Sequence, residues 1–304
     1  MLWLSIVLLV LTFVAVLLVS GNNLSACVGP VIGARIISKQ FGIVLGAAGF
    51  SVGLVAQGAS MTKTVGILLP NAAMQLRAEA LLVAIIVFVI ADLIRVPMSL
   101  SMSLVGLLAG LSIANGGLTS AAYVTEVVAL WIAAPLIAIL FAFYLLRLLN
   151  RGWTENIWRR LQSYKIMLIV LAFSTSYVLG ANTLGLIVAT GGFSWAAVIA
   201  AIVAILIGTF YLSAGEIRRV SQELFLMRYP NATVTLVTST VLVETATILK
   251  IPLSNTQALS AAVFGAGISY KSKFVSLEPF ILIVTSWVIA PLLSFGLGLI
   301  IGTI

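Results

Sequence analysis

Amide side chains stand inside the apolar runs of this sequence at two places that match each other, SGNNL at 20–24 and GANTL at 180–184. The polar side chains that they supply are Asn22, Asn23, Asn182 and Thr183. Backbone that leaves a helix inside a membrane must be satisfied within the protein, so it occurs where it is buried or lines a cavity. Both stretches therefore predict interrupted helices that present amides and hydroxyls to a ligand, with Gly21 and Gly180 releasing the backbone.

Two prolines precede a second pair of polar stretches, PMSLSM from Pro97 and PLSNTQ from Pro252. Proline is favoured in the first turn of a helix, so each marks a helix start. A helix start presents free N–H groups and a positive dipole end, which suits an oxyanion. The side chains that follow are further hydrogen-bonding groups: Ser99, Ser101, Ser254, Asn255, Thr256 and Gln257. Two such starts facing each other would enclose a small tetrahedral anion.

The same residue types also have ordinary structural roles. Ser, Thr and Asn after a proline are common helix caps, and small hydroxyl residues are common where membrane helices pack. For any one of these residues alone, the structural role is the better interpretation. Their occurrence in matched pairs favours the binding site for the set.

Three acidic residues in or beside apolar runs are candidates for carrying a coupling proton, because intramembrane acids are costly and often functional. Asp92 and Glu244 precede the two proline stretches, and Glu126 lies near the start of an apolar run. Asp92 is three residues from Arg95, so a local ion pair explains it equally well. We therefore expect Glu244 to carry the proton. Arg95 and Lys250 would attract anions, with snorkelling at the membrane surface as the alternative.

Composition places these residues in a membrane protein. Of the 304 residues, 62% are hydrophobic and 8% are charged, and the apolar runs are continuous rather than alternating. Continuous apolar runs of about 20 residues satisfy their backbone in lipid as helices. The sequence predicts an all-α multi-pass protein of the cell membrane, with the lipid bilayer as a partner. The net charge of +8 is assigned to cytoplasmic loops rather than to nucleic-acid binding.

The same composition argues against an enzyme. The chain has no histidine and a single cysteine, Cys27, which excludes histidine metal sites and an intrachain disulfide. The eight acidic residues are scattered and form no clustered nucleophile, base or metal set. We expect no catalytic residue, no metal site and no cofactor beyond sodium or a proton as coupling ion.

Four landmarks recur in the same order in the two halves of the chain, at offsets of 155 to 160 residues. The matching pairs are SGNNL with GANTL, SMTKTV at 60–65 with GEIRRV at 215–220, RVPMS at 95–99 with KIPLS at 250–254, and LWIAAPL at 130–136 with SWVIAPL at 286–292. The most charged stretch lies between the halves. We infer a first membrane repeat at 1–146, a cytoplasmic basic linker at 147–165 and a second repeat at 166–304.

Counting the apolar segments gives the orientation of the two repeats. Each half contains about five of them, judged against the ~20 residues needed to span a membrane. The basic linker lies in the cytoplasm by the positive-inside rule, so five crossings per half place both termini outside. The second repeat is then inverted relative to the first. Re-entrant hairpins would change the count without removing the inversion. Inverted repeats are typical of secondary transporters, whose sites lie near the midplane where interrupted helices meet.

At these residues the sequence resembles the inorganic phosphate transporter (PiT) family, which carries a G-A-N-D-V-A-N-type signature once in each repeat. SGNNLSACVGPVIG aligns with that signature and keeps Asn22, Gly29 and Gly33, and GANTLGLIVATGG keeps Gly180, Ala181 and Asn182. The family's later P-x-S-T-T-H element is similar to PMSLSM and, more closely, to PLSNTQ. The resemblance implies an inverted-repeat fold, a homodimer, and transport of inorganic phosphate with sodium or protons by alternating access.

The departures from the family pattern affect the choice of ions. The signature aspartate is replaced by Asn23 and Thr183, and the histidine of the later element by Met102 and Gln257. Losing two carboxylates removes charge that attracts sodium and opposes a dianion. Sulfate, carried by a sulfate-permease-like branch of the family, is therefore the alternative substrate. Neutral oxygens still bind sodium, so Asn23 and Thr183 are candidate coupling-ion residues for sodium, and Glu244 is the candidate for a proton. A passive anion channel is a further alternative.

Overall fold

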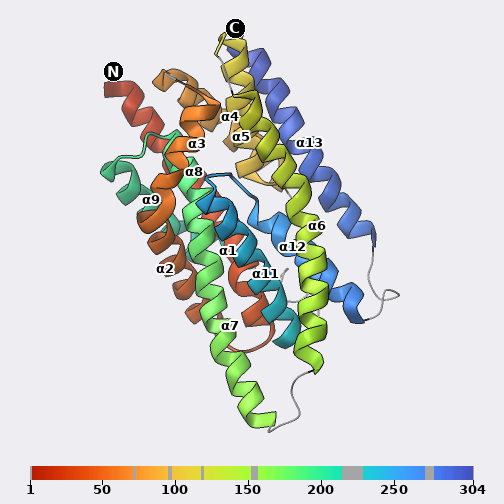
Figure 1. Ribbon diagram of the computed structural model, residues 1–304. Helices are drawn as coiled ribbons and strands as arrows, with labels where there is room; N and C mark the ends of the chain where they lie inside the picture. Colours follow the sequence, from red (N-terminus) through yellow and green to blue (C-terminus); the bar gives the residue numbers. More distant parts are fainter. Residues whose placement is uncertain are drawn as a thin grey trace.

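The computed structural model describes residues 2–70, 73–94, 98–117, 120–151, 157–213, 229–270 and 277–303, and within these ranges it contains helices and turns without β-strands. In chain order the elements are α1 (Leu2–Gly33), α2 (Lys39–Gln57), the 3-10 helix η1 (Gly58–Ser60), α3 (Met61–Leu68), α4 (Met74–Leu93), α5 (Leu100–Ala114), α6 (Ala121–Arg151), α7 (Ile157–Leu179), the π-helix η2 (Gly180–Leu184), α8 (Gly185–Thr190), α9 (Trp195–Ile207), the π-helix η3 (Gly208–Leu212), α11 (Tyr229–Ile248), α12 (Asn255–Tyr270) and α13 (Leu277–Gly302). The all-α class predicted from the apolar runs is confirmed (Figure 1).

Six helical stretches in the described part of the chain are long and apolar enough to cross a membrane, three in each half. They are Leu2–Gly33, Lys39–Leu68, Ala121–Asn150, Ile157–Thr190, Trp195–Leu212 and Val284–Gly302. The five crossings per half that we expected, and the inversion of the second repeat, stay predictions. Helices α4 and α11, with 20 residues each, are also long enough for a membrane span but are not among these six stretches.

The short helices belong to two hairpins. Helices α5 and α12 have 15 and 16 residues, or about 22–24 Å, which is less than the ~30 Å of a bilayer core. Each packs on the helix that precedes it, α5 on α4 and α12 on α11. The turn from α11 to α12 lies between the two ends of the molecule rather than at either end (Figure 1). The α11–α12 hairpin thus brings a helix start into the interior.

The two chain ends lie at one end of the molecule, and the junction of α6 with α7 lies at the other (Figure 1). Helix α6 continues to Arg151 and α7 begins at Ile157. Most of the charged stretch 147–165 is therefore helical, and residues 152–156 lie outside the described part of the chain. Helix α7 extends beyond the rest of the bundle at this end (Figure 1).

The polar signature stretches do not break their helices as expected. Helix α1 runs without interruption through Ser20–Asn23, and the stretch at 180–184 is a wider π-helical turn between α7 and α8. The glycines serve close packing instead. A methyl group at Gly21 would meet the Leu212 Cβ at 2.6 Å, and one at Gly180 would collide with the backbone of Phe50. Small residues let membrane helices approach this closely.

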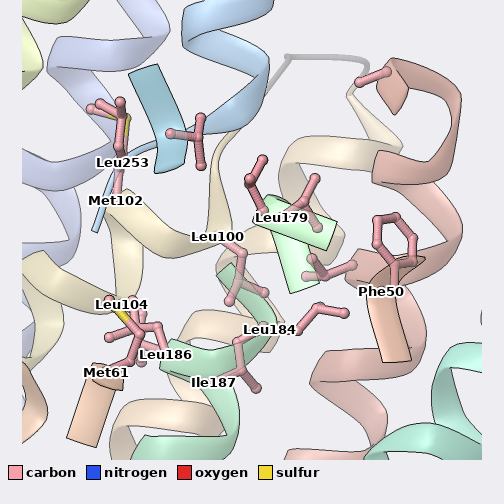
Figure 2. Close-up of a cluster of buried hydrophobic side chains, with 14 of the residues drawn as sticks. Phe50, Met61, Leu100, Met102, Leu104, Leu179, Leu184, Leu186, Ile187 and Leu253 are labelled. Atoms are coloured by element: carbon pink, nitrogen blue, oxygen red, sulfur yellow. The ribbon is translucent and has the colours of Figure 1, made fainter. Parts of the chain in front are cut away.

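Helices of the two halves are interlocked. Helix α5 packs on α13 and α12 packs on α6, while α1 packs on α9 and α2 packs on α7. A large apolar cluster fills the interior between them. Figure 2 shows the part in which Leu100 and Met102 of α5, Leu184 of η2 and Leu253 of the α11–α12 turn contribute to this cluster. Both hairpins therefore border the same core.

Candidate functional site

The turn between α11 and α12 begins with a left-handed residue. The Lys250 N–H donates to the Thr247 carbonyl at 3.0 Å and the Ile251 N–H to the Ala246 carbonyl at 2.8 Å, which closes α11. This is the Schellman arrangement, in which the left-handed position usually holds glycine. Here it holds Lys250, with φ +62°. The chain then has no regular secondary structure from Ile251 to Ser254, and α12 begins at Asn255.

Two hydroxyls from the first half hold the carbonyl of Lys250. The Tyr123 hydroxyl of α6 and the Thr64 hydroxyl of α3 each donate to this oxygen at 2.6 Å. The two hydroxyls also lie within hydrogen-bond distance of each other, at 3.2 Å. The turn is thus fixed to residues more than a hundred positions earlier in the chain.

Asn182 of η2 fixes the next part of the turn. Its Nδ2 donates to the Ile251 carbonyl at 3.1 Å and to the Thr247 hydroxyl at 2.9 Å, and its Oδ1 accepts from the Leu253 N–H at 3.0 Å. The side chain is fully buried. Both amide hydrogens are used within the protein, so the predicted ligand role of Asn182 gives way to a positioning role.

Trp131 and Gln257 form a third attachment. The Trp131 indole N–H donates to the Pro252 carbonyl at 2.8 Å, and Gln257 Nε2 donates to the Trp131 carbonyl at 2.9 Å. With the attachments above, every carbonyl from Lys250 to Pro252 accepts a hydrogen bond from a side chain of another element. The start of α12 is therefore held in place on several sides.

Helix α12 begins at Asn255, three residues after Pro252, so the proline is not in the first turn as we expected. Ser254 precedes the helix, and its Oγ accepts weakly from the Gln257 N–H at 3.4 Å and lies 2.9 Å from the Thr256 hydroxyl. The helix begins later than expected because the Leu253 N–H donates to the Asn182 Oδ1. Ser254 takes the capping position, where serine is strongly preferred.

Several hydrogen-bonding groups at the start of α12 have no partner among the described residues. The first N–H groups of a helix have no intrahelical partner, which leaves those of Asn255 and Thr256 to bind a ligand. Asn255 and Gln257 are each 2% exposed, and Asn255 Oδ1 and Gln257 Oε1 are buried without a hydrogen-bond partner among the described residues. The Asn255 Nδ2 approaches the buried Cys27 Sγ of α1 at 3.8 Å. Helix α1 therefore borders the site.

The start of α5 repeats this arrangement at an offset of 155 residues. The Ser99 and Ser101 hydroxyls lie 2.9 Å apart, as those of Ser254 and Thr256 do. The Ser99 carbonyl accepts the first helical bond, from the Ser103 N–H at 3.1 Å. The preceding Pro97 and Arg95 lie outside the described residues. Both predicted hydroxyl pairs thus occur at helix starts.

The remaining signature residues, Asn22, Asn23 and Thr183, do not hold the α11–α12 turn. Asn22 and Asn23 are half-buried on α1, and Thr183 is 3% exposed in η2. Their side chains make no hydrogen bond within the described ranges. Asn23 is four residues before Cys27, so it shares the helix face that reaches Asn255. These three side chains remain available to a ligand.

Glu244 on α11 is half-buried, and one of its carboxylate oxygens is fully buried. Its Oε1 accepts from the Gln57 Nε2 at 3.1 Å, and its Oε2 is buried without a partner in the described part of the chain. It lies three residues, about one helical turn, before Thr247, which accepts from Asn182. Asp92 and Glu126 are exposed. No three acidic or cysteine side chains gather as a metal site within the described ranges.

Sequence reasoning missed Thr64, Tyr123 and Gln57 as parts of this region, and it used Trp131 only as a landmark of the repeat. The available signals were indirect. Thr64 lies in SMTKTV and Trp131 in LWIAAPL, two of the recurring stretches. Nothing in the spacing along the chain indicates that Tyr123 reaches a carbonyl 127 residues away.

This chain is similar to a protein-family model, to a related protein and to a solved structure. A model described as the phosphate transporter family matches residues 19–177 and 154–298. A candidate phosphate permease of Methanocaldococcus jannaschii is 25% identical over 301 residues, which cover 97% of this chain and 95% of that protein. A solved structure named the sodium-dependent phosphate transporter has a TM-score of 0.83 at 15% identity and covers 99% of each chain. The fold is therefore shared with that structure.

Proposed function

Because the chain belongs to the phosphate transporter family, whose members are transporters rather than enzymes, we propose that it is a secondary transporter of a small inorganic oxyanion, phosphate above all. The observation that carries the proposal is the start of α12. It is fixed by side chains of three other elements, α3, α6 and η2, while its own first N–H groups and one proton of the Ser254–Thr256 hydroxyl pair are left for a ligand. Fixed donors that need no rearrangement favour binding of an anion.

The donors at the start of α12 suit a tetrahedral anion. Backbone N–H groups and the free proton of the Ser254–Thr256 hydroxyl pair donate, while the unpartnered oxygens of Asn255 and Gln257 accept. Phosphate at neutral pH carries one or two protons and can donate to such acceptors, whereas sulfate carries none. The matching hydroxyls of Ser99 and Ser101 at α5 would supply the other side of the site.

Two features support coupling to an ion. The Glu244 carboxylate has one buried oxygen without a partner, so protonation or a cation would satisfy it. Glu244 lies on α11 about one turn before Thr247. The Thr247 hydroxyl accepts from Asn182, and Asn182 holds the turn before α12. We propose that Glu244 carries the coupling proton. Asn23 and Thr183 would provide neutral oxygens if sodium is coupled instead.

Sulfate is the second candidate substrate, because one observation favours it. The two signature positions that carry aspartate in the resembled family are Asn23 and Thr183 here. Without these carboxylates the region repels a dianion less and attracts sodium less. The unpartnered acceptor oxygens of Asn255 and Gln257 argue the other way, in favour of a protonated anion.

The packing of the two halves supports alternating access by inverted repeats. If α1 corresponds to α7, α2 to α9, α5 to α12 and α6 to α13, the contact of α5 with α13 corresponds to that of α12 with α6. The contact of α2 with α7 then corresponds to that of α9 with α1. We propose repeats at 1–146 and 166–304 with the linker 147–165 in the cytoplasm and both termini outside. The homodimer that the family resemblance implies stays a prediction.

The test uses purified protein in liposomes and labelled phosphate or sulfate, under imposed sodium or proton gradients. The proposal expects saturable phosphate uptake that exceeds sulfate uptake and responds to the proton gradient. Glu244→Gln should remove the response to the proton gradient, because glutamine cannot exchange a proton. Linear, non-saturating flux would instead indicate a channel, and a preference for sulfate would establish the second candidate.

A further inference from the structure

Lys250 adopts a backbone conformation that residues with side chains rarely adopt. Its φ of +62° is left-handed, where a Cβ atom crowds the following carbonyl oxygen. Glycine usually occupies this position after a helix. A residue held in such a conformation is a reason to look for a function, because the surrounding structure must impose it.

The surrounding structure imposes this conformation through the main chain. Thr64 and Tyr123 donate to the Lys250 carbonyl, and the Lys250 N–H closes α11. The ammonium group takes part in none of these contacts, and it has no hydrogen bond or ion pair within the described part of the chain. Glycine would serve the backbone equally well, so the lysine contributes its charge rather than its shape.

Lys250 belongs to the turn that leads directly into the helix start that we assign to the anion. Lys250 is half-buried in the α11–α12 turn, four residues before Ser254, and a lysine head sits on a flexible four-carbon stem. Acidic groups do not neutralise it within the described ranges. Glu244 is bonded to Gln57, while Glu126 is exposed on α6 one turn after Tyr123. The ammonium group therefore has no counter-ion among the described residues, and a bound anion would supply one.

We propose that the permanent positive charge of Lys250 stabilises the bound anion, so that anion binding does not require sodium. The proposal rests on the proposed function. Because Asn23 and Thr183 add no negative charge to the site, the ammonium group is not cancelled there. A doubly charged anion would then need one fewer bound cation. Lys250 is a specificity-determining residue in this account.

Three variants separate the charge of Lys250 from its backbone conformation. Lys250→Arg keeps the charge, Lys250→Asn tolerates the left-handed conformation without charge, and Lys250→Gly removes both the side chain and the strain. Phosphate binding to the purified proteins is measured by calorimetry in sodium-free buffer, alongside their melting temperatures. We expect Lys250→Arg to bind within about twofold of the wild type. The asparagine and glycine variants should lose roughly tenfold in affinity without a lower melting temperature.

Two results would overturn the role of Lys250 while phosphate binding by the wild type stands. One is unchanged affinity in the asparagine and glycine variants. The other is an arginine variant as weak as the uncharged ones, which would show that charge is not what matters. If the wild type binds neither phosphate nor sulfate, the proposed function fails, and the role of Lys250 fails with it.

Discussion

Asn182 holds three groups of the α11–α12 region through its amide, whereas Asn22, its counterpart in the first repeat, makes no side-chain hydrogen bond within the described ranges. The difference matters because an amide that is fully used inside the protein cannot also bind an anion. Two residues that are equivalent in the sequence therefore have different roles. Asn182 fixes the helix start, and Asn22 stays available beside it.

Replacing these two asparagines tests that difference. Asn182→Ala leaves the buried Ile251 carbonyl and Leu253 N–H without partners, so we expect it to lower the free energy of unfolding by about 2–4 kcal/mol. Asn22→Ala removes no such bond and should cost less than about 1 kcal/mol. Denaturant unfolding in detergent measures both. Equal losses in the two variants would show that the Asn182 bonds do not fix the turn.

A restored carboxylate tests the two signature positions. If Asn23 lines the site, Asn23→Asp adds a negative charge that attracts sodium and repels the anion when sodium is absent. We expect lower phosphate affinity without sodium and stronger sodium dependence of uptake, and the same direction for Thr183→Asp. Uptake into liposomes at fixed pH, with and without sodium, gives both quantities. Folded, active variants that behave like the wild type would place neither residue at the site.

Helix contacts explain why the signature stretches contain glycine. Figure 1 shows α1, α2 and α7 side by side, and Gly180 lies where the backbone of Phe50 in α2 leaves no room for a Cβ atom. The sequence predicted the helices and placed a helix start within a few residues of Pro252, with re-entrant hairpins as an alternative, because apolar runs and proline report local structure. It predicted breaks at Ser20–Asn23 wrongly, because polar and small residues in apolar helices also serve close packing. Contacts such as Tyr123 to Lys250 depend on tertiary structure and could not be predicted.

A glycine pair tests the packing interpretation. Gly180→Ala forces η2 away from α2, so we expect it to lower stability by about 1–3 kcal/mol. Gly66→Ala is the matched control, because a methyl group there meets nothing within 4 Å in α3. Alanine is the better helix former, so this control should be neutral or slightly stabilising. Melting temperatures of the two variants decide the matter, and an unaffected Gly180→Ala would refute close packing.

Each half of the described chain contributes three of the six helical stretches that are long and apolar enough to cross a membrane. An odd number of crossings per half would place the chain ends on one side and the junction of α6 and α7 on the other, and Figure 1 shows them toward opposite ends of the molecule. The basic residues around that junction, among them Arg147, Arg159 and Arg160, favour its cytoplasmic location.

Reporter fusions test this orientation. A reporter placed near Thr154 should read cytoplasmic, and one fused after Ile304 should read external. The positive-inside rule and the odd number of crossings give this result together. A linker and a C-terminus found on the same side would remove the inversion, and with it the proposed alternating access.

The measurement that tests the central claim most directly is labelled-phosphate uptake by four proteins reconstituted in liposomes. They are the wild type, Ser254→Ala, Thr256→Val and the control Thr245→Val, whose hydroxyl bonds only its own helix at the Val241 carbonyl. Each site variant loses one donor to a charged ligand, worth about 1.5–3 kcal/mol, so phosphate affinity should fall roughly tenfold to a hundredfold. The control should match the wild type. No saturable uptake by the wild type, or equal affinity in all four proteins, would contradict a phosphate site at the start of α12.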